Sequence, residues 1–303
     1  MTAAPSVKAF FDARTSAIQY VVTCPATKTC VIIDPVLDFD EKSGSTATIS
    51  ADAILEYVRD RGLTVAWILD THPHADHFSA ARYLKERTSA STAIGEHIIE
   101  VQALWKEIYG LPSLATDGSQ WDKLLAEGET FRVGEIEARV LFSPGHTRAS
   151  ISYVIGDAAF VHDTLFMPDS GTARTDFPGG SASRLWTSIQ NILSLPDETR
   201  LFVGHDYQPG GREPMWESTV AEQRNANIHL TTTKTEAAFV AMREERDRTL
   251  PMPRLILHSL QVNIQGGMLP EPEGNGRRYL KIPLDALGGA KWDNRVAAKP
   301  RAS

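Results

Sequence analysis

The chain has 303 residues, of which 42% are hydrophobic and 23% are charged, a balance typical of a globular protein with a substantial core. Its net charge of −7 argues against general electrostatic attraction to nucleic acid or to an anionic membrane surface. No apolar run is long enough to span a bilayer, and the first residues lack a basic region followed by an apolar segment. We therefore expect a cytoplasmic protein with neither membrane nor nucleic-acid partners.

The first part of the chain alternates between strand and helix patterns. Apolar residues bounded by turn signals predict the strands, and apolar side chains at helical spacing predict the helices. The predicted strands are 17–22, 30–35 and 64–69, and the predicted helices are 51–60, 78–87 and 97–109. This order indicates a layered α/β organisation with a site on a loop at the end of a strand.

The second part of the chain begins with short strands and continues with helices. The predicted strands are a hairpin at 131–141 broken by Gly134, the pair 151–155 and 158–161, and 200–204. The predicted helices are 184–195, 219–229 and 235–248. From residue 251 onward the sequence is rich in proline and glycine and is predicted to be irregular. We expect residues 1–250 to form one catalytic domain and residues 251–303 an extension packed on it.

The chain contains only two cysteines, Cys24 and Cys30, on either side of a predicted turn. A disulfide across this hairpin is one interpretation, but a reducing compartment favours two small buried hydrophobic side chains. Two cysteines cannot form a zinc-thiolate cage. Any metal ion must therefore be held by histidine and carboxylate side chains.

The stretch Thr71–His77, hereafter the metal turn, directly follows the apolar strand 64–69. Ordinary turns favour Gly, Asn, Asp, Ser and Pro, whereas imidazole and carboxylate groups bind borderline transition metals. The metal turn carries four such groups within six residues: His72, His74, Asp76 and His77. It therefore predicts a metal site whose remaining ligands come from elsewhere in the chain.

Three later turns have the same pattern of an apolar strand followed by a potential ligand, namely His146, Asp163 and His205. His162 adjoins Asp163, and because neighbours in a strand point to opposite faces, only one of the two can reach the metal. The carboxylate beside several histidines favours Asp163. The remaining histidines, like His162, are predicted to lie in the core or on helix surfaces: His97, His229 and His258.

Together these motifs resemble those of the metallo-β-lactamase superfamily. The resemblance rests on the HxHxDH pattern of the metal turn, Pro-Gly-His-Thr at 144–147, Asp163 and Gly-His-Asp at 204–206. It covers about residues 10 to 230. It implies a four-layer αβ/βα sandwich of two mixed sheets with helices outside and a metal site at one edge of the sheets.

Within that superfamily, the segment 164–177 (TLFMPDSGTARTDF) is similar to the GxRTDF segment of the persulfide dioxygenases, which include the human ethylmalonic encephalopathy protein. His-Asp-Tyr at 205–207 and Glu-Gln-Arg-Asn at 222–225 are similar to the downstream signature of that group. The insertion at 117–120 and the tail segment 280–283 resemble a bacterial branch known as β-lactamase-like hydrolases.

Carried over to this sequence, the resemblance implies one Fe²⁺ per chain, held by His72, His146 and Asp163. Two histidines and one carboxylate leave three coordination positions for substrate sulfur, O₂ and water. Four further residues complete a two-metal site in hydrolytic relatives and surround the iron in the dioxygenases: His74, Asp76, His77 and His205. The identity of the ligands therefore leaves one metal ion or two, and iron or zinc, as open alternatives.

The activity implied by the resemblance is that of a persulfide dioxygenase in sulfide oxidation. Glutathione persulfide and O₂ would give sulfite and glutathione, although the thiol carrier stays open. A guanidinium group binds a carboxylate through two parallel hydrogen bonds, so arginines are candidates for holding glutathione. The expected substrate-binding residues are Arg174, Tyr207 and Arg224.

Other functions are compatible with the same motifs. The main alternative is a dinuclear zinc hydrolase of glutathione thioesters, as in glyoxalase II, or of lactones, with a bridging hydroxide between the metals. The acidic charge disfavours the nuclease branch, and the intact ligand set disfavours a protein that only binds metal. A homodimer would be consistent with the resemblance.

Overall fold

One mixed sheet of six strands is built mainly from the first part of the chain. Its strands are β1 (Ser6–Asp12), β2 (Ala17–Thr23), β3 (Thr29–Ile33), β6 (Thr64–Leu69), β8 (Ser91–Gly95) and β9 (Lys123–Leu125). They follow the order β1-β2-β3-β6-β8-β9 in this computed structural model, which describes residues 4–287. The first two pairings are antiparallel and the other three are parallel.

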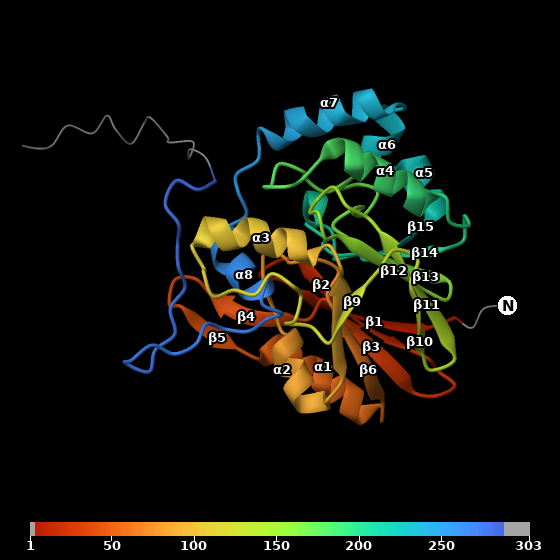
Figure 1. Ribbon diagram of the computed structural model, residues 1–303. Helices are drawn as coiled ribbons and strands as arrows, with labels where there is room; N and C mark the ends of the chain where they lie inside the picture. The colour runs from red at the N-terminus through yellow and green to blue at the C-terminus, as the bar shows by residue number, and fades with distance from the viewer. Residues whose placement is uncertain (1–3, 288–303) are drawn as a thin grey trace, which may run out of the picture.

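A second mixed sheet of six strands faces the first (Figure 1). Its strands are β10 (Thr130–Val133), β11 (Ile136–Phe142), β12 (Ile151–Ile155), β13 (Ala158–His162), β14 (Arg200–Val203) and β15 (Glu217–Thr219). They pair in sequence order, and only the β13–β14 pairing is parallel. The predicted hairpin at 131–141 is confirmed, with Gly134 at a φ of +60° in its turn.

Helices cover the outer faces of both sheets, which confirms the four-layer sandwich (Figure 1). On the first sheet lie α1 (Ile49–Asp60) and α2 (Ala81–Thr88). Against the second lie α4 (Ala182–Leu193), α5 (Val220–Ala226), α6 (Ile228–Thr232) and α7 (Glu236–Asp247). Two more, α3 (Ile98–Tyr109) and α8 (Ile256–Asn263), pack on each other. Within residues 4–287 we find no helix with the length and apolar character needed to cross a membrane.

Alternation along the strands divides the apolar side chains between two cores. On β2, Tyr20 and Val22 face the core between the sheets, whereas Val21 faces α1 and α2. On β3, Ile33 faces the inner core and Ile32 the outer one. Because successive side chains in a strand point to opposite faces, a sheet covered on both sides is apolar at nearly every position.

The same alternation explains the two cysteines. Cys24 belongs to the core between the sheets, and Cys30 lies in the cluster beneath α1 and α2. Both thiols are free and buried. The interpretation of this pair as small buried hydrophobic residues is therefore confirmed.

Two sequence-based predictions of local structure are wrong. Residues 78–87 do not form one helix, because Phe78 and Ser79 form β7 (Phe78–Ser79), which pairs with β4 (Val36–Asp40). The ring of Phe78 stacks on Phe39 with a centroid distance of 4.3 Å, and α2 begins only at Ala81. β4 also pairs with β5 (Ser45–Ala47), which completes a three-stranded sheet.

The second error concerns the C-terminal extension, which contains α8 rather than irregular chain alone. This helix is short, and its polar residues Gln261 and Asn263 are buried like its apolar residues Ile256, Leu260 and Val262. It therefore lacks the single apolar stripe that identifies a surface helix in sequence. Leu260 joins a hydrophobic cluster with residues of α3, and residues 288–303 of the extension lie outside the described residues.

The segment 172–175, part of the RTDF motif region, is held by α6 and α7. Arg243 is buried, lies 2.6 Å from the Asp247 carboxylate and donates to the carbonyl oxygen of Thr172 at 3.0 Å. Asp247 accepts a hydrogen bond from the backbone N–H of Thr175 at 2.8 Å. His229 accepts one from the N–H of Thr172 at its Nδ1, 2.9 Å away.

The buried His229 should make folding stability depend on pH. Burial, together with Arg243 and Arg246, lowers the pKa of His229 to about 4. Its contribution is therefore complete above the ordinary pKa of about 6.5 and is lost as pH falls towards 4, a change of about 3 kcal/mol. Urea unfolding at pH 7 and at pH 4.5 should show a smaller loss of stability for His229→Gln than for the wild type.

The half-exposed His97 provides the control, since His97→Gln should keep the wild-type pH dependence. If His229→Gln and the wild type had the same pH dependence of stability, the buried His229 would not be its cause.

Candidate metal centre

Asp34 attaches the metal turn to the first sheet. It follows β3, whose parallel neighbour β6 leads into the metal turn, so both strands end at the same edge. The Asp34 carboxylate accepts hydrogen bonds from the N–H and the hydroxyl of Thr71, each at 2.7 Å, and lies 3.0 Å from His74 Nε2. Asp34 has a φ of +49°, a left-handed conformation that aspartate tolerates better than most residues.

The hydrogen bonds of Thr71 determine the tautomer of His72. Its hydroxyl gives its one proton to Asp34, so at 3.0 Å from His72 Nδ1 it acts as an acceptor. The ring proton of His72 is then on Nδ1, and the buried Nε2 has a free lone pair and no hydrogen-bond partner. Burial and the neighbouring histidines hold the pKa of His72 well below its ordinary value. The ring is therefore neutral, the form that binds metal.

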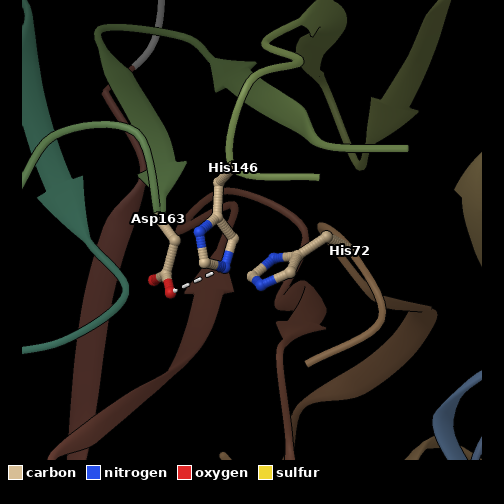
Figure 2. Close-up of side chains that lie close together, drawn as sticks. All are labelled: His72, His146 and Asp163. Atoms are coloured by element: carbon tan, nitrogen blue, oxygen red, sulfur yellow. Dashed lines mark ion pairs between the residues drawn. The ribbon is translucent and has the colours of Figure 1, made fainter. Parts of the chain in front are cut away.

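His146 and Asp163 approach His72 from two other segments of the chain (Figure 2). His146 Nδ1 donates to the carbonyl oxygen of Arg174 at 2.9 Å, which leaves Nε2 free, and burial lowers the pKa of His146. His146 Nε2 lies 3.5 Å from the Asp163 carboxylate. One ligand atom from each of His72, His146 and Asp163 lies within 4.8 Å of the others. This donor set and its free nitrogens fit a transition metal ion.

Two glycines allow the loops to bring these ligands together. A Cβ on Gly204 would lie 2.8 Å from Asp163 Oδ1 and 3.1 Å from the Cα of His162. A Cβ on Gly145 would lie 2.4 Å from the backbone of Leu185, and Gly145 has a φ of +142°. Both positions therefore require glycine for close packing next to a ligand.

A second group of ligands adjoins the first. One ligand atom from each of His74, Asp76 and His205 lies within 4.8 Å of the others. His77 Nδ1 lies 3.0 Å from Asp76 Oδ2, and its buried Nε2 has no hydrogen-bond partner. His205 Nε2 is 3.5 Å from Asp76 and 3.4 Å from Asp163, so Asp163 lies between the two groups. The structure thus brings together all seven predicted ligands.

The charges in the second group stabilise one another. Burial alone would lower the pKa of His74, but the adjacent Asp34 carboxylate outweighs it and raises that pKa to about 9. Burial likewise opposes ionisation of Asp76, yet His205 and His77 hold its pKa well below the ordinary value. Asp163 and Asp76 raise the pKa of His205 against the effect of its burial. A carboxylate that orients a histidine ring is a common feature of metal sites.

A cavity of about 610 Å³ opens beside the ligands. Asp76, His146 and Asp163 lie in its wall, next to the rings of Phe166 and Phe177. The segment that joins α7 to α8 also contributes to the wall, through residues 250–255. Five arginines also line the cavity: Arg14, Arg174, Arg243, Arg246 and Arg254.

Arg174 and Tyr207 line this cavity, as a substrate-binding role would require. The guanidinium group of Arg174 forms two hydrogen bonds with Asp176, at 2.7 and 2.8 Å, and donates to the carbonyl oxygen of Pro251 at 2.6 Å. The ring of Tyr207 stacks on His205 with an interplanar angle of 4°. Arg224 is not part of the cavity wall, because its guanidinium group binds Asp197 and the carbonyl oxygen of Leu193.

Several residues that support the site have no recognisable signal in the sequence. Asp70, which precedes the metal turn, accepts hydrogen bonds from Ser79 Oγ at 2.9 Å and from Trp121 Nε1 at 3.2 Å. Asn263 of α8 contacts the backbone of the metal turn. Arg246 reaches the cavity from the end of a helix that carries several charged residues. Among the residues that support the site, only Gly204 could be suspected from the sequence, because it directly precedes the predicted ligand His205.

The family model that describes the metallo-beta-lactamase superfamily matches residues 18–205. The chain belongs to the metallo-beta-lactamase superfamily. The matched region contains every residue of both ligand groups and ends at His205. The C-terminal helices of the described structure, including α7 and α8, lie beyond it.

Individual relatives place this superfamily member near two kinds of protein. It is 72% identical over 288 residues to "Beta-lactamase hydrolase-like protein" from Xylella fastidiosa, covering 95% of this chain and 67% of the relative. It is 26% identical over 269 residues to "Persulfide dioxygenase ETHE1, mitochondrial" from Bos taurus, covering 88% and 90%. The crystal structure of ETHE1 from Myxococcus xanthus aligns with a TM-score of 0.69 and 31% identity, covering 87% of this chain and 100% of that one. These similarities support the branch that the motifs indicate.

Substitution of Gly204 should weaken metal binding without changing any ligand. In Gly204→Ala the new methyl group would collide with the Asp163 carboxylate, which must then shift from its present position beside His146. We expect the Kd of the metal-free protein for Fe²⁺ to rise at least tenfold, or about 1.4 kcal/mol. The measurement is an anaerobic titration with Fe²⁺.

Gly274→Ala is the matched control, because a Cβ at Gly274 would meet no atom within 4 Å. Equal Fe²⁺ affinities for Gly204→Ala and the control would show that the Asp163 position does not depend on Gly204.

Proposed function

We propose that this protein is a non-haem iron persulfide dioxygenase that converts glutathione persulfide, O₂ and water to sulfite and glutathione. The observation that carries the proposal is the group of His72, His146 and Asp163 beside the cavity. Two neutral imidazoles and one carboxylate hold Fe²⁺ on one side only and leave its other positions open. The bound iron would supply binding positions for sulfur and O₂, together with the redox chemistry that zinc lacks.

The protein's own groups orient the ligands and shape the substrate space. Hydrogen bonds from Nδ1 of His72 to Thr71, and from Nδ1 of His146 to the Arg174 carbonyl, direct both Nε2 atoms towards the same point. Phe166 and Phe177 line the cavity with apolar surface beside the ligands. A persulfide sulfur entering this space would be shielded from bulk water by these rings.

The charges in the cavity wall indicate where glutathione carboxylates would bind. Three of the five arginines are neutralised by acids: Arg14 by Asp12 and Asp38, Arg174 by Asp176 and Arg243 by Asp247. Arg246 has no carboxylate partner among residues 4–287, and Arg254 has only Glu41, at 3.4 Å. We therefore assign the carboxylate contacts first to Arg246 and Arg254, with Arg174 and Tyr207 in the adjacent wall.

The second ligand group favours one other function, a dinuclear zinc hydrolase of glutathione thioesters or lactones. His77 Nε2 is buried and has no hydrogen-bond partner among residues 4–287, so it is available to a second metal ion. Asp163 lies within 3.5 Å of nitrogens from both groups and could bridge two ions. The name of the Xylella relative, a hydrolase-like protein, agrees with this alternative.

Metal analysis and O₂ uptake distinguish the two functions. Protein purified without oxygen should contain about one iron per chain, and should consume O₂ and release sulfite when glutathione persulfide is added. A chelated, metal-free sample reloaded with Zn²⁺ should show no O₂ uptake and serves as the control. Two zinc ions per chain, with thioester hydrolysis and no O₂ uptake, would establish the hydrolase instead.

Removing the unpaired charge at Arg246 should weaken substrate binding and leave the chemistry intact. In Arg246→Gln a charge-assisted hydrogen bond to a substrate carboxylate is lost, so KM for glutathione persulfide should rise about tenfold while kcat changes less than twofold. Steady-state O₂ uptake measures both constants. Arg184→Gln, at an exposed arginine of α4 outside the cavity wall, is the control. A KM unchanged from the control would remove Arg246 from the substrate site.

A further inference from the structure

The buried backbone groups of the metal turn need hydrogen-bond partners. It forms neither helix nor strand between β6 and β7, and most of its residues are buried. Buried N–H and C=O groups need hydrogen-bond partners, and here the usual ladder of a sheet does not supply them. The side chains that take this role therefore also determine how the turn presents its ligands.

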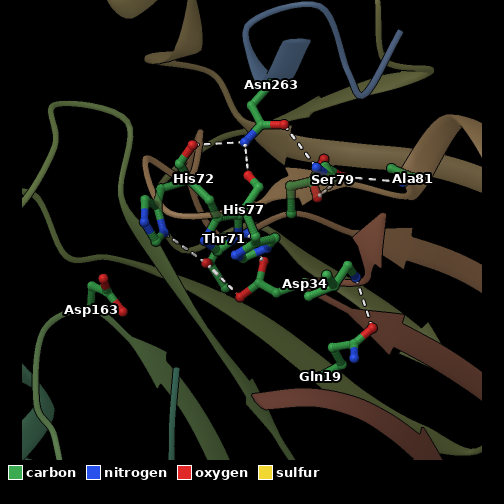
Figure 3. Close-up of polar contacts among 12 residues, drawn as sticks. Gln19, Asp34, Thr71, His72, His77, Ser79, Ala81, Asp163 and Asn263 are labelled. Atoms are coloured by element: carbon green, nitrogen blue, oxygen red, sulfur yellow. Dashed lines mark hydrogen bonds and ion pairs between the residues drawn. The ribbon is translucent and has the colours of Figure 1, made fainter. Parts of the chain in front are cut away.

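The amide of Asn263 meets this need at the far end of the turn (Figure 3). Its Nδ2 donates to the carbonyl oxygens of His74 and His77, both at 2.7 Å. Its Oδ1 accepts a hydrogen bond from the N–H of Ser79 at 2.8 Å. Asn263 is only 2% exposed, so water does not compete for these bonds. Both amide protons and the amide oxygen of Asn263 thus form hydrogen bonds to the backbone of one short segment of the chain, residues 74–79.

These contacts fix the residues of the second ligand group. The two carbonyl oxygens bracket the peptide units on either side of Asp76, and their positions limit the rotation of the backbone between His74 and His77. The near end of the turn is fixed separately, because Asp34 binds Thr71. Asp34 therefore holds Thr71 and contacts the His74 side chain, whereas α8 holds the backbone of His74 and His77.

Asn263 does not belong to the part of the chain that defines the family, which ends at residue 205. It is the last residue of α8, which is anchored independently of the turn. Gln102 of α3 donates to the carbonyl oxygen of Ile264 at 2.8 Å, and Val262 packs into the cluster beneath α1 and α2. The position of Asn263 is therefore set by packing rather than by its contact with the turn.

We propose that Asn263 is a positioning residue for metal binding, through which the C-terminal extension completes the metal centre. It touches neither metal nor substrate and acts through the backbone of His74 and His77. The proposal rests on the proposed metal site but not on the reaction that the site performs.

The same helix offers a closely matched control residue. Gln261 is 3% exposed, and its side chain donates to the carbonyl oxygens of Leu257 at 2.7 Å and Lys281 at 2.9 Å. It also accepts from the N–H of Lys281 at 2.9 Å. Asn263 and Gln261 thus make the same kinds of hydrogen bond at equal burial, but only those of Asn263 reach the metal turn.

The experiment compares Asn263→Leu with Gln261→Met, which remove the amides without changing charge and with little change in side-chain size. Metal-free protein is titrated with Co²⁺ and followed by its visible ligand-field absorption. Asn263→Leu should raise the Kd for Co²⁺ at least tenfold and shift the absorption bands, whereas Gln261→Met should stay within threefold of the wild type with unchanged bands. The Tm of the two metal-free variants should fall by similar amounts.

Asn263→Ala and Gln261→Ala repeat the comparison if the larger replacements prevent folding, and the same difference between them is expected. Wild-type Co²⁺ affinity and spectrum in the Asn263 variants would overturn the proposal. Equal loss of Co²⁺ affinity in the Asn263 variants and the Gln261 variants would also overturn the proposal. It would mean that any damage to α8 weakens metal binding to the same extent. A wild-type protein that does not bind Co²⁺ would refute the metal site itself, a result distinct from the other two.

Discussion

The contact between the Asp34 carboxylate and Thr71 is the interaction on which the metal centre depends. β3 and β6 are parallel neighbours, so the residues that follow them meet at one edge of the sheet, and a short carboxylate can bind both polar groups of Thr71 there. The Thr71 hydroxyl can then only accept a hydrogen bond from His72. The imidazole proton is therefore on Nδ1, and the lone pair of Nε2 is free to bind a metal ion. One acid on the sheet thus determines the chemical form of a ligand that it does not touch.

The ligands could be predicted from the sequence because each one directly follows an apolar strand. In a two-sheet fold such strand ends lie at a common edge, so local patterns are enough to group His72, His146 and Asp163. The groups that orient them could not be predicted in this way. The acceptor for His146 is a backbone carbonyl, which every residue possesses, and Asn263 lies 189 positions from its partner His74. Backbone acceptors and distant contacts leave no pattern in a sequence read locally.

The RTDF motif shows that a motif leaves the contacts of its side chains open. Arg174 lies in the cavity wall, and its guanidinium group pairs with Asp176 of the same motif and lies 5.0 Å from the centre of the Phe177 ring. The motif therefore satisfies its own charge and offers the metal centre a carbonyl oxygen. Arg246 of α7, which has no acidic partner among residues 4–287, reaches the cavity from beyond the region matched by the family. The loops that follow the strands therefore bring the predicted ligands together, and the C-terminal helices add contacts to the metal turn and part of the cavity wall.

The placement of Cys24 and Cys30 on opposite faces of the first sheet has a consequence for their reaction with persulfides, the substrate class proposed above. Persulfides transfer sulfur to accessible thiols, and two neighbouring thiols could then close into a disulfide. Here each thiol is enclosed in a different core, and a shift of one residue in the pairing of β2 and β3 would be needed to bring both to one face. The two thiols are therefore held apart, and within residues 4–287 no cysteine lies in the cavity wall.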